Sequence, residues 1–306
     1  MKVSVIICTY SMERLQDTID AINSILTQTY PHIETIISVD HNEELLAKLK
    51  ELFPENVPFA FNNLVQGLSD TRNAGIKKAT GDIIAFIDDD AIADKKWVEI
   101  MVSNYTNPDI LAVGGKLVPL WEKDRPWWFP EELDWIVGCT YKGHPQEKRN
   151  VRNLIGCNMS FRREIFDKTG YFTNRLGRLG KNALGGEETE LCLKIKAAMP
   201  KAKIIYEPQA VVYHKVPAFR GNFDYMLRRA YGEGLSKANI AKSLGKDDNL
   251  TTESGYLRFL LGKTFPGFIW NVLRLKNPAA NCGRFVTVAG VTLATGLGYL
   301  RIKVRF

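Results

Sequence analysis

The sequence predicts an α/β fold with a mainly parallel central sheet, followed by an apolar, basic C-terminal segment of helices. Short apolar runs rich in β-branched residues, typical of strands buried on both faces, alternate with segments of helical periodicity along the first third of the chain. The 306 residues are 45% hydrophobic and 25% charged, so the chain can bury a sizeable core. This composition excludes disordered, collagen-like and disulfide-scaffold proteins.

The elements follow one another in the strand–helix order that favours parallel pairing. The run IIAFI at 83–87 is the clearest central strand. Ser69 is a candidate N-terminal cap of the helix expected at 69–79. Strands are expected at 3–8, 33–39, 57–61 and 83–87, and helices at 15–26, 42–53, 69–79 and 95–104. Shorter elements are expected at 158–162, 188–197, 203–206 and 211–214.

Acidic side chains stand where two of these strands end. Asp40 follows strand 33–39, and Asp88-Asp89-Asp90 follow strand 83–87. Ligands of such sheets bind beyond the carboxyl ends of the strands. Three adjacent carboxylates repel one another and need a cation or strong hydrogen bonds, and oxygen ligands suit Mg²⁺ or Mn²⁺. The position favours a metal site over the alternative, a solvated acidic turn that caps the next helix.

A second acidic group follows a pair of glycines. Gly185 and Gly186 precede Glu187 and Glu188 at the start of helix 188–197. Acids at a helix start are ordinary, because they interact favourably with the helix dipole. The adjacent glycines are also typical of a mobile loop that closes over a ligand.

Three other polar positions are ambiguous by themselves. His214 ends strand 211–214, and a lone histidine is more often structural than a metal ligand. Arg72-Asn73 belong to a solvated helix face by default, or contact a phosphate or a sugar. Walker A, Rossmann glycine, His-Glu-x-x-His and Gly-x-Ser-x-Gly patterns are absent from the sequence. The sequence therefore lacks the motifs that usually identify NTPases, dinucleotide oxidoreductases, zinc proteases and serine hydrolases.

The net charge of +7 lies entirely in residues 251–306, which hold eight basic residues and one acid. A balanced body with a basic apolar tail argues against nucleic acid and for an anionic membrane surface. Residues 285–300 carry no charge and would span about 24 Å as a helix, less than the roughly 30 Å of membrane hydrocarbon. We expect this segment and 256–275 to lie in the membrane interface. Packing on the rest of the chain, or on a second subunit, is the alternative.

Several stretches, taken in order over roughly residues 3–215, resemble glycosyltransferase family 2, whose members are inverting nucleotide-sugar transferases of the GT-A fold. They are VSVIICTY, QTYPHIETIISVD, GLSDTRNAGIKKATGDIIAFIDDDA, GCNMSFRREIF and GEETELCLKI. At finer resolution the chain is similar to archaeal glucosyl-dolichyl-phosphate glucuronosyltransferases of protein N-glycosylation. The stretches that carry this likeness are MKVSVIICTYSMER, DDDAIAD, AVGGK, PEEL, SFRRE and GEETELC.

The resemblance implies a role for each matching position. A catalytic base is expected at Glu188, with its neighbour Glu187 as the other candidate, although the family commonly has Glu-Asp there. Mn²⁺ or Mg²⁺ would be bound by Asp88, Asp90 and His214. The UDP-sugar would contact Thr9, Tyr10, Asp40, Gly67, Arg72, Asn73, Asp88 and Asp89. A glucuronate carboxylate would pair with one of Arg72, Arg162, Arg178 and Lys181.

The implied protein is a metal-dependent, inverting enzyme that moves glucuronate from UDP-glucuronate to a sugar linked to polyprenyl or dolichyl phosphate. The resemblance implies a GT-A catalytic domain over 1–222, an amphipathic connecting helix over 223–250 and membrane-associated helices over 251–306. The tail would hold the enzyme on the cytoplasmic face of the cell membrane, as a peripheral or monotopic protein. A homo-oligomer stays open, and no nucleic-acid partner is expected.

Three alternatives remain at this level. A family 2 member could use another UDP-hexose on a different acceptor. A non-catalytic protein could bind a UDP-sugar or a lipid phosphate. A nucleotidyltransferase would release pyrophosphate rather than UDP.

Overall fold

A computed structural model describes residues 1–53, 57–174, 185–243 and 251–304. The chain divides into two compact units, which are described separately. The first unit is Met1–Val118, Pro145–Asn182 and Glu187–His214, and the second is Pro119–His144, Ala183–Gly186 and Lys215–Phe306. The predicted domain boundaries at 222 and 250 stay a prediction, and residues 244–250 lie outside the described part of the chain.

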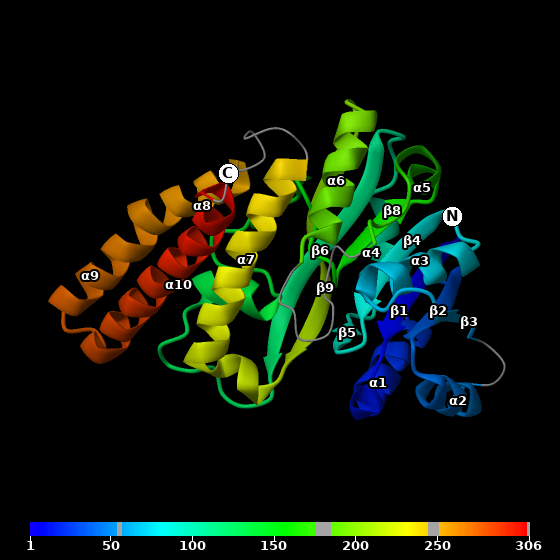
Figure 1. The fold of residues 1–306 in the computed structure, drawn as a ribbon, viewed down its shortest axis with the longest axis horizontal. Helices are drawn as coiled ribbons and strands as arrows, with labels where there is room; N and C mark the ends of the chain where they lie inside the picture. The colour runs from blue at the N-terminus through cyan, green and yellow to red at the C-terminus, as the bar shows by residue number, and fades with distance from the viewer. Residues whose placement is uncertain (54–56, 175–184, 244–250, 305–306) are drawn as a thin grey trace. The chain divides into compact units, whose positions relative to one another are not determined.

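The first unit has the predicted α/β architecture (Figure 1), so the predicted fold class is confirmed. Four strands form a parallel group in the order β3-β2-β1-β4, with Val3 of β1 opposite Ile33 of β2 and Ile83 of β4. The elements up to the first antiparallel strand are β1 (Val3–Thr9), α1 (Leu15–Leu26), β2 (Ile33–Asp40), α2 (Glu43–Leu52), β3 (Phe59–Asn62), α3 (Leu68–Lys78), β4 (Ile83–Asp88), β5 (Ala91–Ala93) and α4 (Trp97–Ser103).

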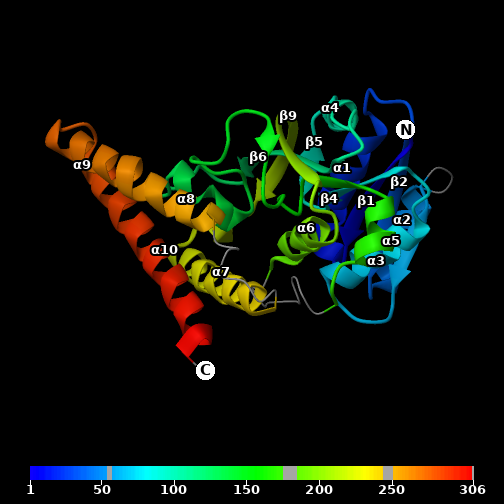
Figure 2. The ribbon, with the colours of Figure 1, turned by 90° about the horizontal axis from the view of Figure 1, so that it is seen from above.

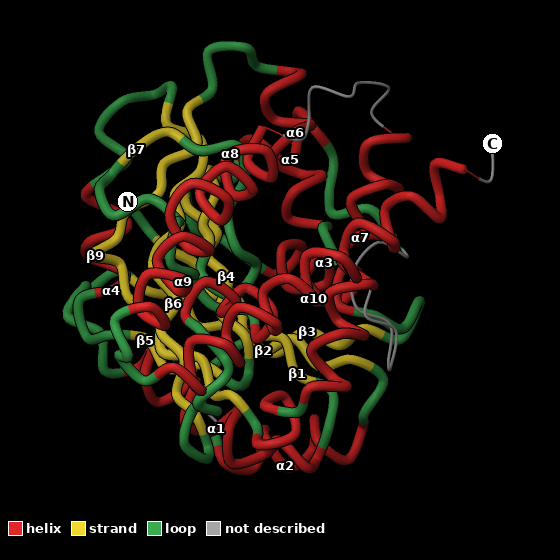
Figure 3. The backbone as a smooth tube through the Cα atoms, turned by 90° about the vertical axis from the view of Figure 1, so that its left-hand side faces the viewer, coloured by secondary structure: helices red, strands yellow, loops and turns green. Residues whose placement is uncertain are grey.

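Beyond β4 the sheet continues in the order β4-β8-β6-β9-β5; β8 is antiparallel to both β4 and β6, and β5 and β7 are antiparallel to β9. The sheet is therefore mixed: β1 to β4 pair in parallel, and β8 runs against its two neighbours, β4 and β6. Figure 3 colours the strands yellow and the helices red. The two short strands expected at 203–206 and 211–214 form one strand. The later elements of this sheet and its helices are β6 (Ile110–Trp121), β7 (Arg149–Asn150), β8 (Met159–Arg162), α5 (Glu164–Thr169), α6 (Glu187–Ala198) and β9 (Lys203–Val216).

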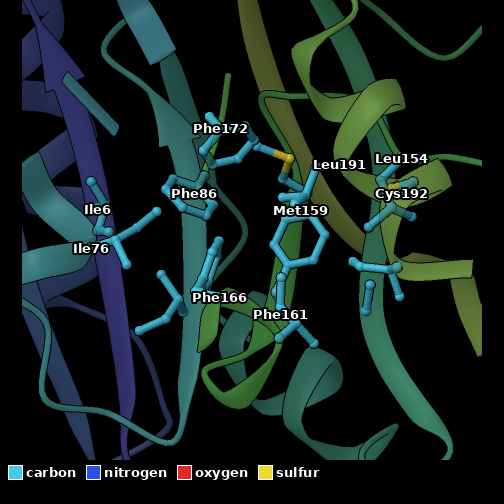
Figure 4. Packing of buried hydrophobic residues seen from close by; sticks show 14 of the residues in the cluster. Ile6, Ile76, Phe86, Leu154, Met159, Phe161, Phe166, Phe172, Leu191 and Cys192 are labelled. Atoms are coloured by element: carbon cyan, nitrogen blue, oxygen red, sulfur yellow. The ribbon is translucent and has the colours of Figure 1, made fainter. Parts of the chain in front are cut away.

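A buried core fixes α3 and α6 to one face of this sheet (Figure 4). Ile6 and Phe86 from the strands meet Ile76 of α3 and Leu191 of α6, all of them buried. The rings of Phe86 and Phe172 pack edge to face, with centroids 5.5 Å apart, which is a preferred aromatic geometry. Burying each large apolar side chain contributes roughly 1.5–3 kcal/mol, so this cluster holds the start of α6 near the end of β4.

The second unit is mostly helical. α7 packs against α10, and α9 and α10 form an antiparallel hairpin (Figure 2). A π-helical turn, Leu260–Thr264, joins α8 to α9 in one continuous run. The elements are a 3-10 helix (Glu131–Val137), a 3-10 turn (Ala218–Gly221), α7 (Phe223–Ser243), α8 (Thr251–Phe259), α9 (Phe265–Leu273) and α10 (Pro278–Val304).

Helix α10 is longer than the uncharged segment expected from the sequence. It continues past Arg284 and Arg301 to a total of 27 residues, about 40 Å. Within the described residues, one helical stretch, Pro278–Ile302, is long and apolar enough to cross a membrane, and 22% of its apolar window is buried. The sixteen uncharged residues 285–300 alone would be too short to cross the hydrocarbon of a membrane. The helix that contains them is long enough to do so.

Candidate active site

The register of the parallel strands brings four polar residues to one edge of the sheet. Cys8 lies opposite Asp88, and Asp40 lies opposite Asn62, so the carboxyl ends of β1 to β4 are level. Thr9 is the last residue of β1, one position after Cys8. The sheet thus gathers the acids that the sequence places at strand ends.

Three predicted metal ligands lie together at this edge. The pairing of β5 with β9 places His214 opposite Ala91, and His214 Nε2 lies 3.3 Å from Asp90 Oδ1. One ligand atom from each of Asp88, Asp90 and His214 lies within 4.8 Å of the others. Asp90 and His214 are buried, whereas the Asp88 side chain is 31% exposed, so the group opens on one side. Two carboxylates and an imidazole are a donor set that fits Mn²⁺ or Mg²⁺.

Arg14 ends a short 3-10 helix, Met12–Arg14, after β1 and pairs with the acids Asp89 and Asp90. Its Nη1 is 2.6 Å from Asp89 Oδ1 and 3.2 Å from Asp90 Oδ2. Burial alone would lower the pKa of the Arg14 guanidinium, but the charges of Asp89 and Asp90 raise it above its ordinary value. Burial raises the pKa of the Asp89 carboxyl to about 7, although Arg14 opposes the shift. Arg14 was not among the predicted site residues, because a basic residue shortly after a strand is by itself an ordinary feature.

Arg72 lies between the metal group, defined as Asp88, Asp90 and His214, and the adjacent glutamates Glu187 and Glu188. Its Nη1 donates to Glu187 Oε1 at 2.7 Å, and its Nη2 lies 3.6 Å from Asp88 Oδ1. Burial would lower the pKa of Arg72, but the charges of Glu187 and Asp88 raise it. Arg72 is 2% exposed and Glu187 is 5% exposed, so this is an interior ion pair rather than a solvated helix face. Glu188, the next residue of α6, is partly exposed.

Both carboxylate oxygens of Asp40 are engaged by the chain. Oδ1 accepts a hydrogen bond from Asn62 Nδ2 at 2.8 Å and lies 2.8 Å from His41 Nδ1. Oδ2 accepts from the backbone N–H of Gly67 at 3.0 Å. Asp40 therefore anchors the loop that leads into α3. Asn62 was not among the predicted site residues, although it directly follows the strand expected at 57–61 and could have been found by the rule that ligands gather at strand ends.

The other predicted donor contacts differ in exposure. Tyr10 is 52% exposed, and its ring lies 5.4 Å from the guanidinium carbon of Arg14. Thr9 is buried with its hydroxyl 3.0 Å from that of Thr18. Asn73 is buried and exchanges hydrogen bonds with the backbone of Phe172. Of the predicted contacts, Tyr10 and Asp88 thus keep part of their surface open.

The four cations named for a glucuronate carboxylate are not equivalent. Arg162 donates to the backbone carbonyls of Ile110, Tyr105 and Asn107, which is a structural role. Arg72 is engaged by Glu187. Arg178 and Lys181 lie outside the described residues.

The chain matches the model of glycosyl transferase family 2 over residues 4–170. It belongs to this family. The family 2 chain is 36% identical over 310 residues to the glucosyl-dolichyl phosphate glucuronosyltransferase of Haloferax volcanii, covering 98% of this chain and 96% of that protein. It is 22% identical over 238 residues to the succinoglycan biosynthesis protein ExoM of Rhizobium meliloti, covering 76% of this chain and 73% of that protein.

A solved structure supports the fold of this family 2 chain. The mannosyltransferase of Pyrobaculum calidifontis, in complex with GDP-Man and Mn²⁺, aligns with a TM-score of 0.60 and 17% identity, over 98% of this chain and 87% of that one. The likeness confirms the GT-A fold. Together with the family match, it makes the protein a glycosyltransferase.

Proposed function

We propose that this enzyme transfers glucuronate from UDP-glucuronate, with inversion, to a sugar carried on dolichyl or polyprenyl phosphate. The observation that carries the proposal is the juxtaposition of a metal-binding group with paired glutamates through Arg72, which lies 2.7 Å from Glu187 and 3.6 Å from Asp88. The choice of donor and acceptor rests on the Haloferax relative, whose name contains both a glucuronosyl group and glucosyl-dolichyl phosphate.

Asp88, Asp90 and His214 are the residues that would hold the divalent cation. When bound, a Mn²⁺ or Mg²⁺ ion supplies positive charge that offsets the charge growing on the departing UDP. The exposed ring of Tyr10 offers a flat surface for the uracil base. Asp40, bonded to Gly67, shapes the loop beside the proposed base pocket.

Glu188 is the proposed catalytic base. Its carboxylate takes the proton from the acceptor hydroxyl while that oxygen bonds to the anomeric carbon of the donor sugar. The bond from that carbon to the diphosphate oxygen breaks on the opposite face, so UDP leaves with the electron pair and the configuration inverts. Glu188 is only partly buried at the start of α6, which leaves it accessible to an acceptor.

The proposed site of action is the membrane surface that carries the lipid-linked acceptor, on its cytoplasmic face. Leu293, Leu297 and Leu300 recur along α10, and each is more than half exposed. On α9, the guanidinium carbon of Arg274 lies 4.3 Å from the centre of the Trp270 ring. Exposed leucines with tryptophan and arginine beside them are typical of helices that contact anionic lipid.

A donor panel tests the proposed reaction. The full chain would be assayed for UDP release from UDP-glucuronate, UDP-glucose, UDP-galactose and UDP-N-acetylglucosamine, with Mn²⁺ and glucosyl-phosphate-polyprenol present. We expect acceptor-dependent release to be largest with UDP-glucuronate and to stop with a chelator. A preference for another donor would overturn the glucuronosyl assignment, and pyrophosphate release would overturn the reaction class.

Vesicle sedimentation tests the membrane assignment. The double substitution Leu293→Gln and Leu297→Gln should weaken binding to vesicles that contain phosphatidylglycerol, because it removes exposed apolar surface from α10. Leu64→Gln is the matched control, since Leu64 is 81% exposed but belongs to the first unit. Equal sedimentation of the two variants would contradict a membrane role for this face of α10.

A further inference from the structure

We propose that Glu187 accepts a hydrogen bond from a hydroxyl group of the transferred sugar through Oε2, and that Arg72 is the positioning residue that fixes it there. This inference rests on the proposed function, because it takes the sugar to lie between the metal ligands and α6. It gives Glu187 a binding role and leaves Glu188 as the base.

The first observation is the rigidity of the pair. Arg72 Nη1 holds Glu187 Oε1 at 2.7 Å, and Arg72 Nη2 donates to the carbonyl of Gly156 at 3.3 Å. The rings of Phe86 and Phe172 lie 5.8 and 5.4 Å from the guanidinium carbon. An arginine held by two acceptors and two rings has little freedom, so it fixes the orientation of the Glu187 carboxylate.

The second observation is the other oxygen of the same carboxylate. Glu187 Oε2 is buried and accepts no hydrogen bond from any residue in the described ranges. A buried carboxylate oxygen without a donor is costly, and native structures supply one from the protein, from water or from a ligand. The side chain is 5% exposed, so bulk solvent reaches it poorly.

The chemistry of the surroundings selects the ligand group. A carboxylate only accepts hydrogen bonds, so its partner must donate, and the carboxylate of a uronic acid would be repelled. Glu187 is separated from the metal ligand Asp88 by a single guanidinium group. Asp88, Asp90 and His214 would hold the cation beside the diphosphate, so the hydroxyl groups of the donor sugar would be the nearest ligand donors to Glu187. A hydroxyl bonded to a charged acceptor makes one of the stronger hydrogen bonds available to a neutral ligand.

Proton uptake fits Glu187 poorly. Its Oε1 is bonded to Arg72, and protonation would weaken a buried ion pair. Glu188 lies next to it on α6 and is partly exposed. In this proposal Glu187 binds a hydroxyl group of the sugar, and Glu188 accepts the proton of the acceptor hydroxyl.

The test compares deoxy donors in three proteins. UDP-glucuronate and its 2-, 3- and 4-deoxy analogues would be assayed with the full wild-type chain, with Glu187→Gln and with Glu190→Gln. Glu190 is the matched control: it lies in the same first turn of α6 and its Oε2 also accepts no hydrogen bond from the described residues, but its Oε1 pairs with Lys194 rather than with Arg72. One deoxy donor should lose about 10- to 100-fold in kcat/KM with the wild type and with Glu190→Gln, but less than about 3-fold with Glu187→Gln. Equal losses in all three proteins for every deoxy donor would overturn the proposal.

A binding measurement separates this inference from the proposed function. By calorimetry with Mn²⁺ present, Glu187→Gln should weaken the affinity for UDP-glucuronate and UDP-glucose by about tenfold while leaving the affinity for UDP unchanged. Unchanged affinity for both sugars would overturn the hydroxyl contact. If only the choice of UDP-glucuronate as donor were wrong, the wild-type enzyme would prefer another donor in the panel described above.

The positioning role of Arg72 has its own readout. Arg72→Gln should raise KM for the donor and abolish the difference between the normal and the deoxy sugar, and adding Glu187→Gln should cause no further loss. Arg72→Lys keeps the charge beside Glu187 and should restore part of that difference. A purely structural arginine would lower the amount of folded enzyme and leave the discrimination of the remaining enzyme intact, which would overturn the assignment.

Discussion

Replacing Gly298 by alanine tests the close crossing of α7 and α10 in the second unit. A Cβ atom at Gly298 would lie 3.0 Å from the carbonyl carbon of Tyr231 and 3.3 Å from Cα of Gly234. In the other direction, a Cβ at Gly234 would lie 2.8 Å from the backbone nitrogen of Tyr299. The nearest atoms to the two added Cβ atoms are the carbonyl oxygens of Tyr231 and Thr295, which lie well inside van der Waals contact. The two backbones would therefore have to separate by about an ångström or more.

The expected magnitude combines two opposing effects. Overpacking costs about 1–3 kcal/mol, whereas alanine is favoured over glycine in a helix by about 1 kcal/mol. The backbone atoms in the way cannot rotate aside, so we expect Gly298→Ala to destabilise the protein by about 1–2 kcal/mol, or roughly 2–3 °C in Tm for a chain of this length. The assay is thermal unfolding of the detergent-purified full chain, followed by tryptophan fluorescence.

Gly296→Ala, on the same helix, is the matched control, because no described atom outside the neighbouring helix backbone lies within 4 Å of the added Cβ. It should gain about 0.5–1 kcal/mol from helix propensity alone and raise Tm. Opposite signs for the two alanines are the expected result. Equal shifts would refute the conclusion that α7 and α10 approach each other through these glycines.

Three further outcomes are expected. Glu188→Gln should lower kcat by about 10²–10⁴-fold while the calorimetric affinity for UDP survives, and near-normal turnover would remove it as the base. Asp90→Asn should abolish Mn²⁺-dependent binding of UDP, and unchanged calorimetric binding would remove Asp90 from the metal group. Burial alone would raise the pKa of the Glu34 carboxyl, but hydrogen bonds from Ser4 and Thr80 lower it to about 2. Because this pKa is depressed in the folded state, the stabilisation is present above about pH 4.5 and is lost as the pH falls toward 2. At pH 7 the free energy of unfolding of the wild type should exceed that of Glu34→Gln by roughly 1–2 kcal/mol, after allowance for solvent screening. Denaturant unfolding measures this difference, and its persistence at pH 2 would contradict the prediction.

The group of Asp88, Asp90 and His214, the proposed metal site, was largely predictable because its two acids lie close together in sequence and follow a recognisable strand. Asp88 and Asp90 needed only the rule that ligands gather at the carboxyl ends of strands. His214 joins them through the pairing of β5 with β9, and no local pattern announces a contact over that separation. The family resemblance identified His214, whereas periodicity alone left it ambiguous.

The Arg72–Glu187 pair could not be derived from local sequence. The two residues are 115 positions apart, and an arginine on a polar helix is by default solvated. Its burial depends on α3 and α6 packing on the same face of the sheet. The strand order beyond β4 was hidden for the same reason, because alternating periodicity identifies strands without saying which neighbours they choose.

The second unit is assembled from distant parts of the chain, and this limits how the enzyme can be shortened. Trp135 Nε1 donates to the Tyr256 hydroxyl at 3.2 Å, and that hydroxyl donates to the Glu132 carbonyl at 2.7 Å. Arg284 Nε donates to the carbonyl of Trp127 at 3.0 Å. Cutting the chain before Thr251 would strip these partners from residues 119–144, which stay behind in the longer fragment. To obtain a soluble form of the enzyme, replacing the exposed leucines of α10 by polar residues is therefore preferable to deleting the helices. Deletion would remove an apolar surface but would also expose side chains and backbone groups of residues 119–144 that these helices now contact.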